Sequence, residues 1–158
     1  MFFIASTVLG QPCDSLLIVS RDKFTDAEEV AMSRPIVKTQ GESETLTLRV
    51  SPTKNKSLVF EASVVSSSFG CTDEKGMVYF VFDNNEKFSL HNQAKINCKG
   101  LSLVYLTGGL GNKALLYLLT KRRIAAIRIT SREESFEADL DEREGLELQK
   151  VLNCMLKR

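Results

Sequence analysis

Hydrophobic and polar residues alternate with a period of two along two stretches in the first half of the chain, a pattern typical of β-strands with one buried face. Residues 45–51 (TLTLRVS) place Leu46, Leu48 and Val50 on one side, and residues 58–66 (LVFEASVVS) alternate in the same way. A short stretch rich in turn-forming residues separates the two runs. Together they predict a β-hairpin.

A second hairpin is predicted from residues 77–82 (MVYFVF) and 87–91 (KFSLH). The turn between them contains Asn84 and Asn85, and asparagine tolerates the positive φ that tight turns require. Residues 77–82 are apolar on both faces, so we expect a central strand that is covered on both sides.

The second half of the chain continues with strands and two helices. Residues 101–106 (LSLVYL) indicate a strand, residues 112–122 a short helix, and residues 123–130 with 135–140 a last hairpin. Asp141 is suited to cap a C-terminal helix. We expect the buried face of that helix to carry Leu146, Leu148, Val151, Leu152 and Met155, with Cys154 on or beside it.

Short turns join most of these strands, so antiparallel pairing should dominate. Further strands are predicted near residues 29–33 and 35–39. The fold class is therefore α+β: a mainly antiparallel curved sheet or partly open barrel, with a short inserted helix and a C-terminal helix. The length of 158 residues fits one domain, which we assign to residues 11–158.

The N-terminal run 2–10 (FFIASTVLG) is apolar but too short to span a bilayer, so we expect no stable membrane insertion. It resembles the hydrophobic part of a secretory signal, with Thr7 and Gly10 near a possible cleavage point. The positively charged start of such a signal is missing. We interpret residues 1–10 as a truncated signal-peptide remnant; the alternative is a buried first strand.

The four cysteines, Cys13, Cys71, Cys98 and Cys154, are not spaced as metal ligands, so we predict no metal site. They allow three disulfide connectivities. We prefer Cys71–Cys98, within one compact segment, and Cys13–Cys154, which ties the two ends together. Disulfides would indicate an exported protein, periplasmic or extracellular. The alternative is four free thiols in a cytoplasmic protein.

Charge and histidine content narrow the possible functions. Lys and Arg total 21 against 20 acidic residues, a net charge of +1, so the composition gives no reason to expect nucleic acid as a partner. His91 is the one histidine, which leaves little material for acid–base catalysis or a histidine metal site.

The segment after residues 101–106 matches a dinucleotide-binding fingerprint, G-x-G-x-x-[G/A], through Gly109, Gly111 and Ala114. Glycines at such a turn let backbone amides approach a pyrophosphate. The surrounding strands are antiparallel in character, and too few βα units follow. Lys113 is not placed as in a phosphate loop. We predict no cofactor, an empty turn, and a positive φ at one or more of its glycines.

Four acids near one another in sequence, Glu137, Asp139, Asp141 and Glu142, suggest an alternative function, a small carboxylate-dependent enzyme. Such chemistry requires two carboxyl groups that converge in space, one with a raised pKa. We expect these acids instead on the outer face of a strand and in a helix N-terminal turn.

Several short motifs resemble those of small exported bacterial proteins of unassigned function: DKFTD (22–26), FGC (69–71), VFDNNEKFSL (81–90), IAAIRIT (124–130) and LNC (152–154). The resemblance implies export and disulfides, and it implies no activity, ligand or site. We therefore predict an exported, disulfide-stabilised binding or interaction module without catalytic activity, whose partner is a protein or a small molecule. A nucleotide-binding protein that uses the Gly109–Gly111 turn is a further alternative.

Overall fold

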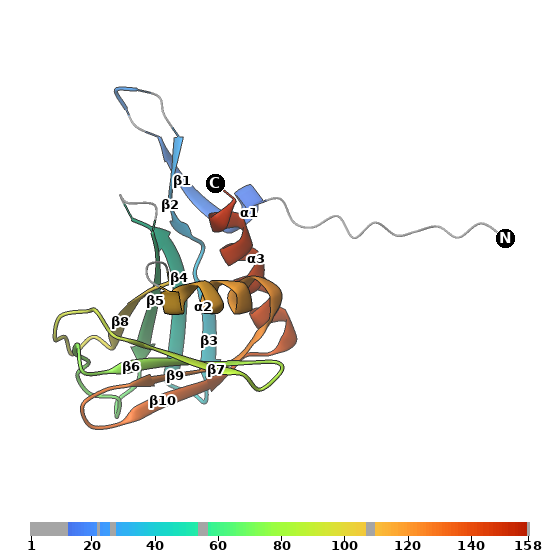
Figure 1. The fold of residues 1–158 in the computed structure, drawn as a ribbon. Coiled ribbons are helices and arrows are strands. Elements are labelled where there is room, and N and C mark those ends of the chain that lie inside the picture. Colours follow the sequence, from blue (N-terminus) through green and yellow to red (C-terminus); the bar gives the residue numbers. More distant parts are fainter. Residues whose placement is uncertain (1–12, 22, 26–27, 54–56, 107–109, 158) are drawn as a thin grey trace.

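The computed structural model describes residues 13–21, 23–25, 28–53, 57–106 and 110–157 (Figure 1). The predicted signal-peptide remnant, residues 1–10, lies outside the described residues. The described chain is α+β with mostly antiparallel strands, which confirms the predicted class.

The strands form three sheets that are not closed into a barrel. We call the two larger ones the first and second sheet. The first sheet has the order β3-β4-β5-β8, with β3 (Ile36–Gln40), β4 (Glu44–Pro52), β5 (Leu58–Val65) and β8 (Leu101–Tyr105). The second has the order β10-β9-β6-β7, with β6 (Met77–Phe82), β7 (Lys87–His91), β9 (Ile124–Thr130) and β10 (Ser135–Asp139). A two-stranded sheet joins β1 (Leu17–Arg21) and β2 (Glu28–Ser33).

All three predicted hairpins are present, as the antiparallel pairs β4–β5, β6–β7 and β9–β10. Asn85 has φ 64° in the β6–β7 turn, as its residue type suggested. Where the sequence left open a curved sheet or a partly open barrel, the described strands are divided among three sheets, two of them four-stranded.

Strand β6 is central, since β9 and β7 flank it. The prediction that both of its faces are covered was wrong, because Tyr79 is 36% exposed while Val78, Phe80 and Phe82 are buried. The second sheet therefore has one core face and one solvent face, as antiparallel sheets commonly do.

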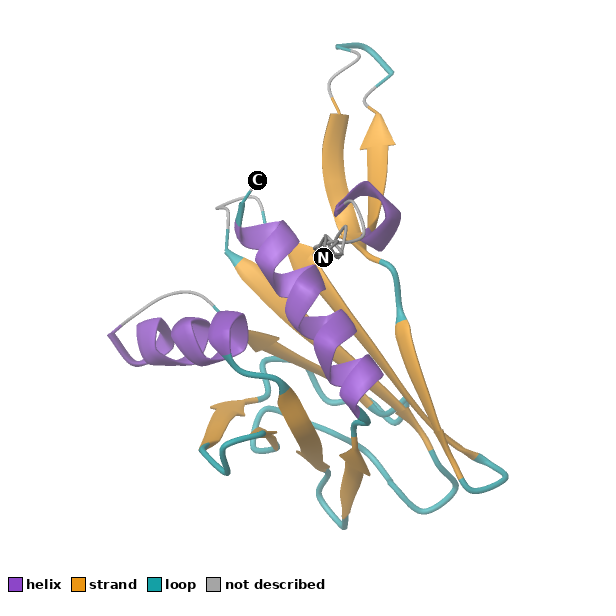
Figure 2. Cartoon of the chain, turned by 90° about the vertical axis from the view of Figure 1, so that its right-hand side faces the viewer, coloured by secondary structure: helices purple, strands orange, loops and turns teal. Residues whose placement is uncertain are grey.

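Three helices complete the described chain: α1 (Cys13–Leu16), α2 (Leu110–Lys121) and α3 (Glu142–Leu156). Helix α3 lies diagonally across one face of the first sheet, and α2 packs beside it (Figure 2). Asp141 is the N-cap of α3, as predicted, and forms a capping box with Glu144. Leu146, expected on the buried face of α3, is exposed.

Glu144 also joins α3 to the first sheet. The Lys38 Nζ donates to Glu144 Oε2 at 3.0 Å, and the same oxygen accepts from Asp141 N at 2.9 Å. One buried carboxylate therefore holds both the start of α3 and the edge strand β3.

The core lies between the two four-stranded sheets and under α3. Phe60 of β5 and Phe80 of β6 meet edge to face, with ring centroids 5.2 Å apart, and so link the sheets. Leu148 and Leu152 of α3 are fully buried against this core. Burial of each such side chain contributes about 1.5–3 kcal/mol.

Both preferred disulfides are formed, Cys13–Cys154 and Cys71–Cys98. The first ties α1 to α3, next to the β1–β2 hairpin that projects from the body of the molecule (Figure 1). Neither α1 nor β1 was predicted from the sequence. None of the described helices is long and apolar enough to cross a membrane.

The two disulfides should differ in their effect on stability, because they close loops of different length, with separations of 141 and 27 residues. From loop entropy, Cys13→Ala/Cys154→Ala should lower the free energy of unfolding by about 5 kcal/mol, and Cys71→Ala/Cys98→Ala by about 3.5 kcal/mol. Urea denaturation of the two double variants measures the difference. A larger loss for the Cys71–Cys98 variant would contradict the expectation.

Candidate functional site

Strand β8 carries apolar side chains on both faces, with Val104 in the core. Its inward residues include Ser102, which is buried with no hydrogen-bond partner for its hydroxyl. Its outward residues are Leu101 and Leu103, both half-buried, and Tyr105, which is 48% exposed. The solvent face of an antiparallel sheet is ordinarily polar, so apolar side chains at all three outward positions of β8 mark this surface as unusual.

We call the side of the first sheet turned away from α3 the outer face. Val65 on β5 and Val37 on β3 also lie on it and are 62% and 53% exposed. At its centre, Arg49 of β4 stands opposite Glu61 of β5, with 3.6 Å between Arg49 Nη1 and Glu61 Oε1. The outer face thus combines apolar residues with one cation and one anion.

The hydrogen-bonding edge of β8 is already occupied by the loop that precedes the strand. Leu103 N donates to Asn92 Oδ1 at 2.8 Å, and Leu103 O accepts from Gln93 N at 2.7 Å. Leu101 N donates to Asn97 Oδ1 at 3.0 Å. These contacts block the addition of another strand at this edge, so a partner would meet β8 through its face.

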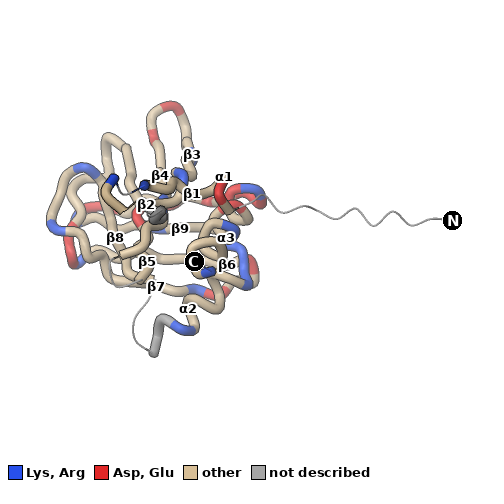
Figure 3. The backbone as a smooth tube through the Cα atoms, turned by 90° about the horizontal axis from the view of Figure 1, so that it is seen from above, with Lys and Arg blue, Asp and Glu red and all other residues tan. Residues whose placement is uncertain are grey.

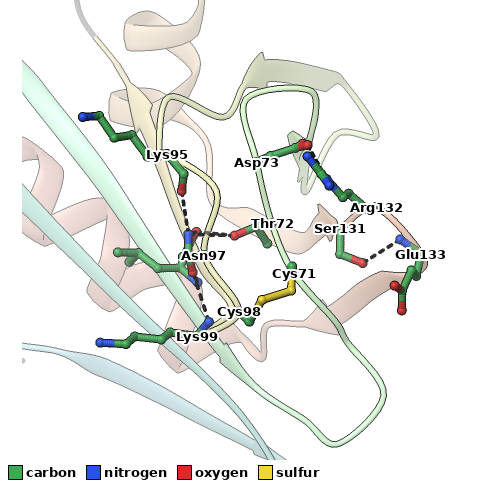
Figure 4. Close-up of a disulfide and its surroundings, with 11 residues drawn as sticks. Cys71, Thr72, Asp73, Lys95, Asn97, Cys98, Lys99, Ser131, Arg132 and Glu133 are labelled. Atoms are coloured by element: carbon green, nitrogen blue, oxygen red, sulfur yellow. Dashed lines mark hydrogen bonds and ion pairs between the residues drawn. A yellow bond between two sulfur atoms is a disulfide. The ribbon is translucent and has the colours of Figure 1, made fainter.

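The same loop is held by a dense set of bonds around the Cys71–Cys98 disulfide (Figure 4). Thr72 and Asn97 form a β-bridge with N–O distances of 2.8 and 2.9 Å. The Thr72 hydroxyl donates to Leu101 O at 2.7 Å. Residues 71–73 and 92–98 are thereby fixed to one end of β8.

A surface depression of about 410 Å³ lies beside this disulfide. Phe69 is buried in its lining, and Val65, Cys98 and Lys99 are exposed on it. Because Val65 is also an outer-face residue, the depression and the outer face form one continuous surface. Its groups are apolar side chains, serine hydroxyls and one ammonium group, which suit contact and hydrogen bonding with a partner.

Gly100 fixes the entry into β8. It has φ +67°, and a Cβ at this position would overlap the Val64 carbonyl oxygen. Val64 N donates to Gly100 O at 3.0 Å, so the two backbones are in direct contact. Only glycine satisfies both conditions.

An ion pair supports the loops from the other side. Arg132 Nε donates to Asp73 Oδ2 at 2.6 Å, and Lys75 N donates to Asp73 Oδ1 at 3.0 Å. The hydrogen bond from Arg132 is the main reason why the pKa of Asp73 lies below its usual value, with a smaller contribution from Lys75 N–H. Arg132 thus ties the β9–β10 turn to the loop that contains Cys71.

The glycine fingerprint does not lie in the fold that a dinucleotide site requires. Gly109 lies outside the described residues, Gly111 lies in the first turn of α2, and Lys113 is exposed. Strands β8 and β9, before and after α2, belong to different sheets. Helix α2 is therefore not the crossover of a parallel sheet, which the dinucleotide fold requires.

The predicted positive φ at this turn is not found at Gly111, which is helical. The part of the prediction that concerns residues 108 and 109 falls outside the described chain. Among the described glycines, positive φ occurs at Gly41, Gly70 and Gly100.

The four acids of the enzyme alternative do not converge on one site. Glu137 pairs with Arg128 at 2.6 Å on the solvent face of β9–β10. Asp141 accepts from Glu144 N, and mainly for this reason its pKa is lowered, whereas an acid catalyst would need a raised one. Asp139 and Glu142 are exposed. Within the described ranges, no three His, Cys, Asp or Glu side chains are grouped to hold a metal.

No protein-family model, no curated protein and no solved structure matches this chain. The outer face and the depression are therefore described from the chemistry of their own residues. Sequence reasoning predicted β8 as a strand but missed its outward apolar residues. The available indication was Ser102, a polar residue between two leucines in a strand that is otherwise apolar.

Gly100→Ala should destabilise the protein more than Gly41→Ala. Both glycines have positive φ, which penalises alanine by about 1–2 kcal/mol, but a Cβ at Gly41 meets nothing within 4 Å. The additional loss at Gly100 measures its contact with Val64. Thermal unfolding of the two variants makes the comparison, and equal losses would show that the contact is unimportant.

The Asp73–Arg132 pair should make stability depend on pH. Because the folded pKa of Asp73 is lowered, its stabilising effect is present above the unfolded pKa of about 3.9 and is lost as pH falls below it. Asp73→Asn should therefore be less stable than wild type at about pH 6, and the difference should shrink toward about pH 3. Urea midpoints across this range test the expectation. Arg132→Gln should reduce the same pH dependence, and a constant difference would refute the assignment.

Proposed function

We propose that this chain is an exported, disulfide-stabilised interaction module that binds a protein partner through the outer face and the adjoining depression, without catalysis. The observation that carries the proposal is the outward side of β8, where Leu101, Leu103 and Tyr105 are all apolar or aromatic. An apolar surface on a strand whose edge is closed is suited to face-to-face contact.

The rigidity of this end of the molecule supports a binding role. The disulfide, the Thr72–Asn97 bridge and the Asp73–Arg132 pair all hold loops that border the depression. A surface fixed before binding loses less conformational entropy when the partner arrives. Two disulfides also suit an oxidising compartment outside the cytoplasm.

Export is tested by the redox state of the cysteines in cells that express the protein naturally. Cells are fractionated, and the protein is alkylated before and after reduction. We expect the protein in the exported fraction, with no cysteine labelled before reduction and all four labelled after it. Four reactive thiols in unreduced protein from the cytosol would overturn the proposal.

The binding surface is tested with a photo-crosslinking amino acid placed at the half-buried Leu103, with the exposed Tyr117 on α2 as the control. In the exported fraction, position 103 should give one adduct of defined mass that position 117 does not give. Val65→Lys, on the same face, should remove that adduct. Equal labelling at both positions, or none at position 103, would overturn the proposed surface.

A further inference from the structure

We infer that the outer face binds a second copy of this chain in a face-to-face dimer. The inference rests on the proposed function and names its partner. Its basis is that two central rows of side chains on the outer face are complementary to the same rows after rotation about a two-fold axis.

The pairing register of the strands defines rows of side chains across the outer face. One row contains, from β3 to β8, Val37, Thr47, Ser63 and Leu101. The next row contains Arg49, Glu61 and Leu103 on β4, β5 and β8. In each row, the side chains on β3 and β4 differ from those on β5 and β8.

A two-fold axis parallel to the strands, between β4 and β5 and in the plane of contact, reverses the order of each row in the second copy. Arg49 then faces Glu61 of the other copy, and Glu61 faces its Arg49. Val37 faces Leu101, and Thr47 faces Ser63. Such an arrangement pairs opposite charges twice and covers the exposed valine with a leucine, which is the self-complementarity of an isologous contact.

The central charges form an ion pair within one chain that is longer than a hydrogen bond, with 3.6 Å between Arg49 Nη1 and Glu61 Oε1. Both side chains are partly exposed, 39% and 32%. A partner that carries a single strong charge would repel one member of this pair, whereas a second copy satisfies both.

The rest of the surface agrees with a partner that is itself nearly neutral. Acidic and basic residues are interspersed over the described chain rather than gathered on one side (Figure 3), and the net charge of the chain is +1. Two copies therefore experience little overall repulsion.

The size of the face limits the strength of the dimer. Four strands spaced about 4.8 Å apart, with a mean length of about seven residues, give roughly 400 Å² of sheet in each copy. This is below the ~800 Å² per partner of a standard stable interface. We therefore expect weak association, as in transient contacts.

Charge reversal tests the geometry. Arg49→Glu and Glu61→Arg, each alone, place like charges across the dimer, so each variant should dissociate at least tenfold more readily than wild type in sedimentation equilibrium. An equimolar mixture of the two should associate again, because each copy then faces the opposite charge. The double variant Arg49→Glu/Glu61→Arg should self-associate like wild type.

Controls separate this result from loss of folding. Far-ultraviolet circular dichroism and thermal melting of each variant establish that it is folded, and recovery in the mixture requires folded chains. Tyr117→Glu adds a charge at an exposed position on α2 and should leave association unchanged. Wild type that stays monomeric at millimolar concentration, or dimers that are unaffected by the single reversals, would overturn the inference.

The two proposals fail in distinguishable ways. A crosslinked adduct at position 103 with twice the mass of the chain supports the dimer. An adduct of another mass, together with a monomeric wild type, rejects the dimer and retains the outer face as a surface for a different protein. Absence of any specific adduct at position 103 together with a monomeric wild type rejects both.

Discussion

Burial of the inner face of the first sheet determines how the remaining elements are placed. Leu46, Leu48 and Phe60 on this face are removed from water by two elements that approach from the same side. The second sheet reaches it through the Phe60–Phe80 contact, and α3 crosses it diagonally. Since both elements lie on the inner side, the described chain supplies no layer over the outer face. Apolar residues there are therefore not explained by the core of this domain.

The loops around the Cys71–Cys98 disulfide decide which part of β8 a partner can reach. Asn92 and Asn97 satisfy the backbone groups at the edge of the strand, and Gly100 brings the strand against Val64. An open edge would invite strand addition by any extended chain. With the edge closed, contact is restricted to side chains on the outer face, where the order of Arg49 and Glu61 can select a partner.

Features that depend on local chemistry could be predicted from the sequence. The hairpins follow from period-two alternation around short turns, and the Asp141 cap follows from residue types at a helix start. The division into two sheets could not be predicted, because it depends on which hairpins stack in space. The orientation of β8 was also hidden, because residues 101–106 have apolar side chains at both alternations, with Ser102 the one exception, and the pairing with β5 decides which side is buried. The strand before Gly111 and the helix that contains it were recognised, whereas the placement of β8 and β9 in different sheets was not.

The observed register of β8 lowers the stability of the folded protein. A buried hydroxyl without a partner, as at Ser102, costs about 1–3 kcal/mol, and half-exposed Leu101 and Leu103 forgo part of their burial. A shift by one residue would turn both leucines inward but Val104 outward. It would also separate Gly100 from Val64 and remove Leu101 and Leu103 from their asparagine partners. The loop contacts and the buried Val104 therefore fix together which face of β8 is turned outward. Buried polar groups without partners and exposed apolar residues concentrate at functional sites. For this reason we assign the function to β8 and not to the glycine turn that follows it.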